Sequence, residues 1–306
     1  MTALESKLGR YCQPSSDHEQ EKQERAERMV RSAVGSWVAD YSDITLKYVP
    51  KGSYANNTNV RQDSDVDIAV LRTDFHYYDA SGLRDADRQT GSSRTFTLEG
   101  IDFRNSLARH LKNRFGSGCD ISGSTAIELV ENSGRVSADV VPSFDFRKYY
   151  YDSSGRVAYH SGQKVFKTDG SSVINYPVQQ LENGRAKNNA TGNRYKKLVR
   201  ILKRAENDLV ELGRIDPLPS YFMECLMYRV PNSVINVVSS NPLSAALADA
   251  VDYIWVETFE DQSARTWKEP NEIKDLFGGT QKWTLEEAHD LAREVWGLFD
   301  LDKVKK

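Results

Sequence analysis

The first half of the chain alternates between segments with a helical period and segments with a strand period. Residues 17–40 are rich in Glu, Gln, Arg and Ala, and their apolar residues fall on one side of a helix. Residues 103–115 (FRNSLARHLKNRF) have the same amphipathic period. Residues 44–50 (ITLKYVP) and 66–72 (VDIAVLR) are strand-like. This half is expected to combine helices with a sheet.

The rest of the first half predicts further strands and one long excursion. Residues 73–98 are polar and are expected to cross the surface without regular structure. Residues 125–131 (TAIELVE) and 135–141 (RVSADVV) look like two strands joined by a tight turn. Short β-like segments follow to about residue 168.

The pattern changes near residue 171, after which the helical period dominates. It is clear in residues 193–212, 220–230 and 284–299. The last of these opens with a capping box formed by Thr284 and Glu287. The chain therefore divides into an α/β first half and a helical second half.

Composition narrows the class of protein. The 306 residues carry 41 Lys and Arg against 44 Asp and Glu, a net charge of −3, which argues against nucleic-acid binding through bulk positive charge. The three cysteines have no CxxC spacing, so we expect free thiols. The start lacks the apolar core of a signal peptide, and no apolar run approaches the roughly 18–20 residues of a membrane span. A cytoplasmic protein without a membrane partner is expected.

The candidate chemistry begins in KGSYANNTNVRQDSDVDIAV, residues 51–70. Side chains two apart in a strand share a face and lie about 6–7 Å apart, so Asp65 and Asp67 are neighbours while Val66 and Ile68 enter the core. Two such carboxylates favour a hard divalent cation such as Mg²⁺, which also takes substrate phosphates as ligands. The alternative is a solvated strand end that is acidic by chance.

Two further features favour the metal site. Gly52-Ser53 suits a turn whose N–H groups approach phosphate oxygens. Asp139 lies in VSADVVPSF, where an unpaired buried carboxylate would be costly, so it is expected to face a ligand. Three carboxylates beside a Gly-Ser turn are typical of two-metal phosphoryl transfer.

Gly52-Ser53, eleven residues, then Asp65-Val66-Asp67-Ile68 resembles the signature of the polymerase-β-type nucleotidyltransferases. Asp139 matches the third carboxylate of that family. The resemblance implies that Asp65, Asp67 and Asp139 are catalytic and hold two Mg²⁺ ions, for which Mn²⁺ can substitute. Asp63 has the same spacing but is assigned no ligand role.

The second half narrows the branch. INYPVQQLENGRAKNNATGNRYKKLVRILKRAEND and LPSYFMECLMYRVPN resemble the bacterial CD-NTases, relatives of cyclic GMP-AMP synthase, and in particular their CdnE-like branch. The resemblance implies an α+β fold. Residues 1–170 would form the nucleotidyltransferase core, a mixed sheet with helices and a long N-terminal helix. Residues 171–306 would form an α-helical domain that closes the nucleotide pocket.

The resemblance also marks residues that would bind nucleotide. Residues 185–204 carry eight Lys and Arg and no Asp or Glu, and the family places a cation here against the triphosphate. Its main contact is left open among Lys196, Lys197, Arg200 and Lys203; the alternative is a solvated basic face. Gly52 and Ser53 would also contact phosphate.

Ser220 and Tyr221 open the next helix after Pro219. In the family the Ser holds phosphate and the Tyr stacks on a base; an N-cap Ser and a core Tyr are the alternative. Asn175 falls where relatives carry a base-facing residue, and its amide could read uracil. For Asn175, a loop position before Tyr-Pro is the favoured interpretation.

The resemblance implies an enzyme that condenses two or three nucleoside triphosphates into a cyclic oligonucleotide second messenger, with release of pyrophosphate, in bacterial antiphage (CBASS) signalling. ATP, UTP and GTP are the candidate substrates, and an effector protein would read the product. The chain has no Cys/His cluster between its halves, so no long nucleic-acid activator is expected. A monomer is expected. The alternative is nucleotidyl transfer to an RNA 3′ end, a protein or a small molecule.

Overall fold

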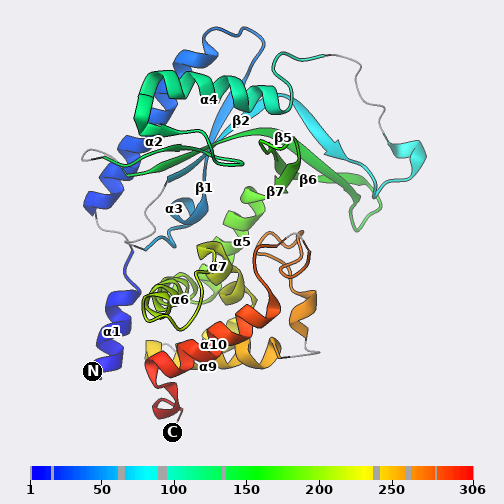
Figure 1. Cartoon of the computed structure of the whole chain (residues 1–306). Coiled ribbons are helices and arrows are strands. Elements are labelled where there is room, and N and C mark those ends of the chain that lie inside the picture. Colours follow the sequence, from blue (N-terminus) through cyan, green and yellow to red (C-terminus); the bar gives the residue numbers. More distant parts are fainter. Residues whose placement is uncertain are drawn as a thin grey trace. The chain divides into compact units, whose positions relative to one another are not determined.

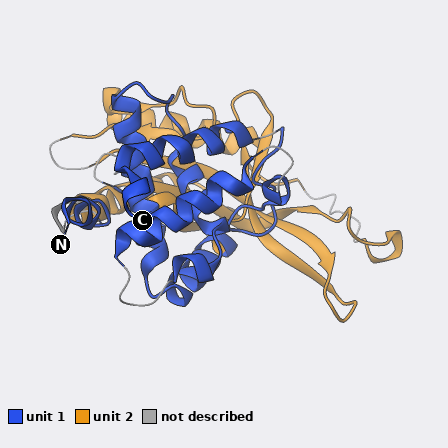
Figure 2. Ribbon diagram, turned by 90° about the horizontal axis from the view of Figure 1, so that it is seen from below, with its two compact units in different colours: residues 1–15, 55–63, 179–306 blue, residues 16–54, 64–178 orange. Residues whose placement is uncertain are grey.

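The computed structural model describes residues 2–14, 17–60, 66–88, 95–132, 136–236, 242–259, 263–279 and 281–305. The chain divides into two compact units (Figure 2). Unit 1 consists of residues 1–15, 55–63 and 179–306, and unit 2 of residues 16–54 and 64–178. Each unit has its own hydrophobic core.

Unit 2 is built on a seven-stranded mixed sheet (Figure 1). Its strands are β1 (Leu46–Lys51), β2 (Val66–Asp79), β3 (Cys119–Asp120), β4 (Ile127–Leu129), β5 (Ala138–Tyr151), β6 (Val157–Phe166) and β7 (Ser172–Asn175). The order is β1-β2-β5-β4-β3, and β6 pairs with both β5 and β7. β2 and β5 are parallel, so their amino ends meet at the same edge of the sheet.

Two helices, α2 (Asp17–Val38) and α4 (Ile101–Phe115), lie side by side against one face of this sheet (Figure 1). Val30 and Phe103 bring the helices into a core that also contains Ile68 and Val140 from the sheet, and all four are fully buried. Short 3-10 turns occur at η1 (Asp85–Asp87) and η2 (Gly116–Gly118). Both predicted helices of the first half are confirmed.

The expected excursion at residues 73–98 is wrong for its first part. β2 continues through residue 79, and its second half pairs with β5 after an irregularity between Arg72 and His76. The segment TDFHYYD contains aromatic side chains, which favour a pleated strand although the segment looks polar. β5 and β6 are likewise longer than the short segments expected there, with 14 and 10 residues.

Unit 1 is helical, as the period of the second half predicts. Its helices are α1 (Ala3–Tyr11), α6 (Arg194–Glu211), α7 (Ser220–Arg229), α8 (Asn232–Ile235), α9 (Leu243–Glu257) and α10 (Leu285–Phe299), with the short turns η3 (Ser263–Thr266) and η4 (Leu301–Lys303). The chain passes between the units within α3 (Gly52–Asn56) and α5 (Pro177–Ala190). The predicted capping box is confirmed: Thr284 N–H donates to Glu287 Oε2 at 2.6 Å, and Glu287 N–H donates to Thr284 Oγ1 at 3.1 Å.

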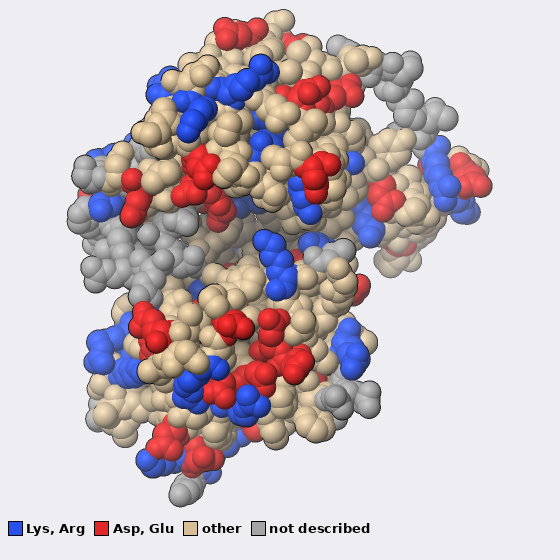
Figure 3. Space-filling model, in the orientation of Figure 1, with Lys and Arg blue, Asp and Glu red and all other residues tan. Residues whose placement is uncertain are grey.

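The surface and the thiols also agree with the composition. Acidic and basic side chains are interspersed over the face drawn in Figure 3. All three cysteines are buried and carry free thiols. Within the described residues, none of the helices combines the length and the apolar character needed to span a bilayer.

Candidate active site

A row of charged residues crosses the sheet of unit 2 near the amino ends of β2 and β5. The strand register aligns, in order across the sheet, Lys51, Asp67, Asp139, Glu128 and Asp120. Directly paired residues on neighbouring strands point to the same face, and such strands lie about 4.8 Å apart. The carboxylates of Asp67 and Asp139 therefore share the face opposite to α2 and α4.

The local sequence forces this orientation. Asp67 stands between Val66 and Ile68, and both apolar side chains are fully buried in the core of unit 2. Asp139 stands in the same way between two fully buried residues, Ala138 and Val140. A one-residue slip of either strand would bury a carboxylate and expose its apolar neighbours, so the period-2 pattern fixes the row.

Gly52 brings the predicted phosphate turn against this row. Its φ is +65°, and a Cβ at this position would lie 2.0 Å from Oδ2 of Asp67. Both observations require glycine. Other residues rarely adopt this backbone conformation, and the position has no room for a side chain. The turn and the Asp67 carboxylate are therefore in direct contact within unit 2, with Ser53 next in α3.

The residues present fit a divalent cation, although the complete ligand set is not visible. Asp65, the first carboxylate of the predicted signature, lies outside the described residues, as does Asp63. Among the residues that the structure describes, no cluster of three His, Cys, Asp or Glu side chains forms a metal site. Asp67 and Asp139 nevertheless supply paired oxygen ligands on one face, the donor type that Mg²⁺ and Mn²⁺ take.

Three members of the row, Lys51, Glu128 and Asp120, were missed by the sequence analysis. Lys51 ends β1 opposite Asp67; burial lowers the pKa of its ammonium group, and the Asp67 charge raises it. Glu128 is exposed on β4 opposite Asp139. The only available signal was the alternation of Ile127, Glu128 and Leu129, which shows that Glu128 faces away from the core but not which residue lies beside it.

In unit 1, two of the predicted nucleotide-binding residues line one pocket of about 540 Å³. The lining residues are Val60, Lys203, Glu206, Asn207, Val210, Glu211, Pro217, Leu218 and Ser220. Lys203 is only 3% exposed. Ser220 is the first residue of α7, and the N-cap is Pro219, so the N-cap alternative for Ser220 is wrong. The lysine and the helix N-terminus favour an anion in this pocket, whereas the two carboxylates of its lining, Glu206 and Glu211, oppose one.

The other cations of α6 are placed differently. Arg200 is buried, and its Nε and Nη1 donate to the carbonyls of Cys12 and Asn57, each at 2.6 Å. Lys197 is exposed. Lys196 is half-buried, and burial lowers the pKa of its ammonium group while Glu224 raises it. Arg200 therefore holds backbone of unit 1, and the structure brings Lys203 rather than Arg200 together with Ser220.

A buried carboxylate fixes the same stretch of backbone. Glu224 of α7 is 1% exposed and accepts hydrogen bonds from Asn56 Nδ2 at 2.5 Å and from Thr58 Oγ1 at 2.8 Å. Gln180 Nε2 donates to it at 3.3 Å. A buried carboxylate is tolerated only with such donors. Together with Arg200, Glu224 immobilises the stretch of chain that leads toward Asp65.

Tyr221 contributes to the core of unit 1. The side chain is partly buried, its hydroxyl donates to Glu269 Oε2 at 3.2 Å, and its ring meets Trp283 edge-on at 6.2 Å. Burial raises the pKa of its hydroxyl. This is the arrangement of the core-Tyr alternative, which leaves only part of the ring to contact a base.

Asn175 is the last residue of β7, so the favoured interpretation of a loop position is wrong. It is half-buried and pairs with Gln163 of β6, which puts the two side chains on one face of the sheet. Gln163 is 3% exposed, and its Oε1 has no hydrogen-bond partner in the described part of the chain. Gln163 is a second amide at this position that the sequence analysis missed.

The sheet has paired carboxylates on two central parallel strands, beside a Gly-Ser turn, and the C-terminal part of the chain is helical. These features define the nucleotidyltransferase class. The family model described as the cGAS/DncV-like nucleotidyltransferase C-terminal helical domain matches residues 182–300. Folds of this class generally use divalent metal ions.

Full-length relatives give the family. The chain is 35% identical over 298 residues to the cyclic dipyrimidine nucleotide synthase CdnE of Legionella pneumophila, covering 96% of this chain and 97% of the relative. It is 34% identical to the protein of the same name from Cecembia lonarensis, covering 97% and 98%. The solved Rhodothermus marinus CdnE c-UMP-AMP synthase with Apcpp and Upnpp superposes with a TM-score of 0.79 at 25% identity, covering 97% and 96%. The chain belongs to the CdnE-like CD-NTases.

Proposed function

We propose that this enzyme joins two pyrimidine nucleotides into a cyclic dinucleotide. As a CdnE-like CD-NTase it condenses nucleoside triphosphates into a cyclic oligonucleotide second messenger and releases pyrophosphate in CBASS signalling. The pyrimidine assignment is supported by the names of two full-length relatives, each a cyclic dipyrimidine nucleotide synthase. The observation that carries the chemistry is the register pairing of Asp67 with Asp139.

The acidic row would hold the metal ions. Asp67 and Asp139, joined by Asp65, are the ligands we propose for two Mg²⁺ ions or for Mn²⁺ in their place. Bound there, the metal neutralises phosphate charge and makes the attacking 2′- or 3′-hydroxyl easier to deprotonate. Because Asp67 and Asp139 point to one face, they orient the hydroxyl and the α-phosphate for an in-line displacement.

The donor triphosphate would be held by cations and N–H groups. We assign this role to the Gly52-Ser53 turn in unit 2 and to Lys203 and Ser220 in unit 1. Arg200 is given a positioning role, because its donors already serve two backbone carbonyls. Lys196 remains a candidate for a secondary phosphate contact. The proposed division into a catalytic core of residues 1–170 and a helical domain of residues 171–306 follows the same division of tasks. It differs from the two compact units at residues 1–15 and 55–63, which group with the helical unit, and at residues 171–178, which group with the sheet.

Base selection is assigned to Asn175, with Tyr221 offering a stacking surface. An amide presents both a donor and an acceptor, which matches the edge of uracil, so UTP is the first substrate to test. We further propose that the enzyme is a monomer and that no long nucleic-acid activator controls it. A downstream effector protein would bind the cyclic product. Because its substrates are cellular nucleoside triphosphates, we place the reaction in the cytoplasm.

The test is to incubate the enzyme with all four NTPs and Mg²⁺, and then with each pair, and to identify phosphatase-resistant products by mass spectrometry. A cyclic dipyrimidine is expected, and Asp67→Asn and Asp139→Asn should abolish it. A cyclic purine product would overturn the pyrimidine assignment while leaving the synthase. Extension of RNA, or modification of protein without any cyclic product, would overturn the synthase itself.

A further inference from the structure

Lys187 belongs to the basic run of residues 185–204 but has no role in the proposed reaction. It lines a pocket of about 380 Å³ in unit 1 that, among the described residues, shares no lining side chain with the pocket of Lys203 and Ser220. The lining comes from α5, the end of α7, the start of α8 and three residues outside the helices: Asn183, Ala186, Lys187, Ala190, Tyr228, Arg229, Val230, Pro231, Asn232 and Glu272. A pocket of this size admits a small molecule.

Lys187 is held in place with donor capacity to spare. Its Nζ donates to the carbonyl of Val230 at 2.7 Å and to Asn232 Oδ1 at 3.0 Å. An ammonium group has three donors, so one remains for a ligand. The Nζ also lies 5.4 Å from the centroid of the Tyr228 ring, which fixes its direction further.

Arg229 supplies a second set of unused donors. Its Nη1 donates to the carbonyl of Lys268 at 3.2 Å and to Glu272 Oε1 at 3.0 Å. Its Nε is buried and has no hydrogen-bond partner among the residues that the structure describes. Because this Nε is buried, a ligand in the pocket cannot reach it. The Arg229 side chain as a whole stays 23% exposed, so a ligand can contact only the outer part of its guanidinium group.

The charge balance also favours an anion. Lys187 and Arg229 contribute two positive charges and Glu272 one negative charge, which is paired with Arg229 at 3.0 Å. One positive charge is therefore left over. The proximity of Arg229 adds to burial in lowering the pKa of Lys187 to about 8. An anion between the two cations would relieve this repulsion.

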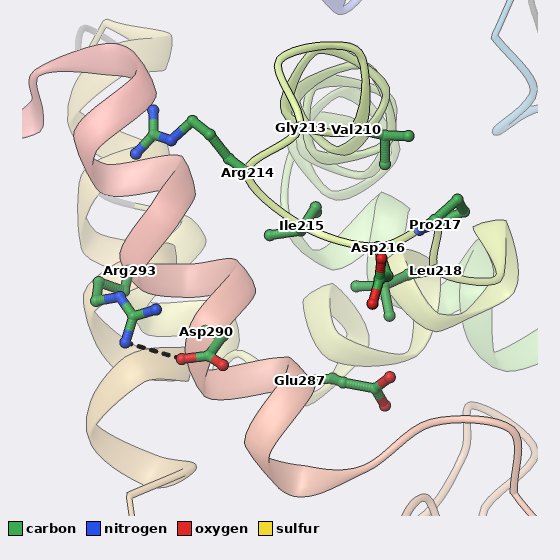
Figure 4. Close-up of a pocket in the computed structure, with 10 residues that line it drawn as sticks. All are labelled: Val210, Gly213, Arg214, Ile215, Asp216, Pro217, Leu218, Glu287, Asp290 and Arg293. Atoms are coloured by element: carbon green, nitrogen blue, oxygen red, sulfur yellow. Dashed lines mark ion pairs between the residues drawn. The ribbon is translucent and has the colours of Figure 1, made fainter.

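A third pocket of unit 1 shows the contrast (Figure 4). It is lined by Arg214 and Arg293 together with three acidic residues. Arg293 pairs with Asp290 at 2.8 Å, and Arg214 pairs with Glu294 at 2.5 Å. Both arginines are thus neutralised by carboxylates, whereas the cations beside Tyr228 outnumber their acidic partner.

We propose that the pocket between Lys187 and Arg229 binds the phosphate group of a small ligand. Arg229 offers the exposed part of its guanidinium group, and Lys187 its third N–H, so the donors that line this pocket come from two helices. Phosphate suits this arrangement because arginine binds it through a fork of N–H groups and lysine adds a point charge. The ligand would tie α5 to the end of α7.

The test uses isothermal titration calorimetry with inorganic phosphate at constant ionic strength and without divalent metal. We expect saturable binding to the wild type, and a loss of about tenfold in affinity in both Lys187→Gln and Arg229→Gln, the size expected for one hydrogen bond to a charged group. Arg293→Gln, which removes an arginine paired with Asp290, is the control and should bind as the wild type does. Lys203→Met measures how much of the bound phosphate occupies the proposed triphosphate pocket.

The outcomes separate this proposal from the proposed function. Absence of saturable phosphate binding in the wild type, or its loss only in Lys203→Met, would overturn the second site. Equal competition by acetate would overturn the assignment to phosphate. Glycerol phosphate binding more tightly than inorganic phosphate would identify a phosphate monoester as the ligand, and equal binding would identify free phosphate. Circular dichroism checks folding, and if Arg229→Gln is unfolded, Lys187→Gln decides.

Discussion

The two units hold like-charged side chains together in different ways. In unit 2, Asp67 and Asp139 are neighbours because the register of the parallel strands β2 and β5 pairs them directly. In unit 1, the cations of α6 lie on one helix, yet Arg200 serves backbone carbonyls while Lys203 lines a pocket. The register of paired strands therefore aligns charged side chains in a row. Charged side chains on one helix can instead have different roles, because each makes different hydrogen bonds.

The strongest test of this difference is to remove a carboxylate from the row. Asp67→Asn or Asp139→Asn should lower kcat for pyrophosphate release by about 10³-fold, because a metal ligand is lost where the charge of the transition state develops. Thermal stability should not fall in Asp139→Asn, since a like-charge contact is removed, whereas Asp67→Asn also takes a counter-charge away from the buried Lys51 and should be less stable. Coupled detection of pyrophosphate and a melting curve measure the two effects.

The matched control for this prediction is Asp120→Asn, at the far end of the same row. Asp120 is exposed, and its Oδ1 accepts a hydrogen bond from the Ser122 N–H at 2.8 Å. Its activity should stay close to that of the wild type. Equal losses in all three variants would mean that charge anywhere along the row matters, and that the paired position of Asp67 and Asp139 is not special.

Gly52→Ala tests whether the turn and the row act together. The new Cβ would meet the Asp67 carboxylate at 2.0 Å and displace it, so kcat should fall about 10²-fold, the loss that a small misplacement of a catalytic group produces. Gly155→Ala is the control, because Gly155 has φ +76° but a Cβ there would have no described atom within 4 Å. It should share the backbone strain and lose only stability, by about 1 kcal/mol. Wild-type activity in Gly52→Ala would refute the contact.

Arg200 and Lys203 test the same contrast in unit 1. Arg200→Met leaves the carbonyls of Cys12 and Asn57 without their donor, so the free energy of unfolding should fall by about 2 kcal/mol. Lys203→Met should instead raise KM for the nucleotide about tenfold, with a smaller change in stability. Urea denaturation and initial-rate kinetics separate the two. If the effects were exchanged, Arg200 would be the phosphate residue and Lys203 the structural one.

The sequence predicted most elements but only part of the site. The alternation around Asp67 and around Asp139 identified two strands with outward carboxylates, because burial of every second residue leaves a period. Their pairing in register depends on the tertiary structure, and so does the position of Lys51, Glu128 and Asp120 in the same row. A single charged residue in a strand produces no periodic pattern, so the sequence did not identify these three.

In the helical unit, too, the sequence predicted where side chains lie on an element but not what they contact. Lys196, Arg200 and Lys203 were correctly placed on one helix, since their spacing follows its period. Nothing in that spacing indicated that Arg200 would be used by the carbonyls of Cys12 and Asn57, which lie far away in the chain. The strand at Asn175 was missed because it has only four residues, too few for a period to be visible.

Asn175→Ala tests whether an amide on the sheet of unit 2 selects the base. Loss of the amide should shift the preference for UTP over ATP by up to about tenfold, because the hydrogen bonds to the edge of the base are lost while base stacking remains. Competition between the two nucleotides, with products separated by chromatography, measures the ratio. Ser172→Ala, on the same short strand, is the control. An unchanged ratio in Asn175→Ala would move base selection elsewhere, with Gln163 the next residue to test.

The last prediction concerns how Lys187 makes the free energy of unfolding depend on pH. Lys187 lines a pocket but has no role in the proposed reaction. Burial and the charge of Arg229 lower its pKa from the ordinary 10.5 to about 8. Between these two values the unfolded chain holds a proton that the folded chain has released, so this residue makes stability rise with pH across that window. Below about pH 8 both states are protonated, and its contribution is constant and destabilising.

Other groups titrate in the same range, so the informative quantity is the difference between the wild type and Lys187→Gln. That difference should change steadily from about pH 8 to pH 10 in urea denaturation and be flat below it. Lys47→Gln, at an exposed position of β1, is the matched control for the loss of a lysine side chain. Inorganic phosphate bound between Lys187 and Arg229 would raise the pKa of Lys187 again and move the change to higher pH. A difference between the wild type and Lys187→Gln that does not depend on pH would refute the lowered pKa of Lys187.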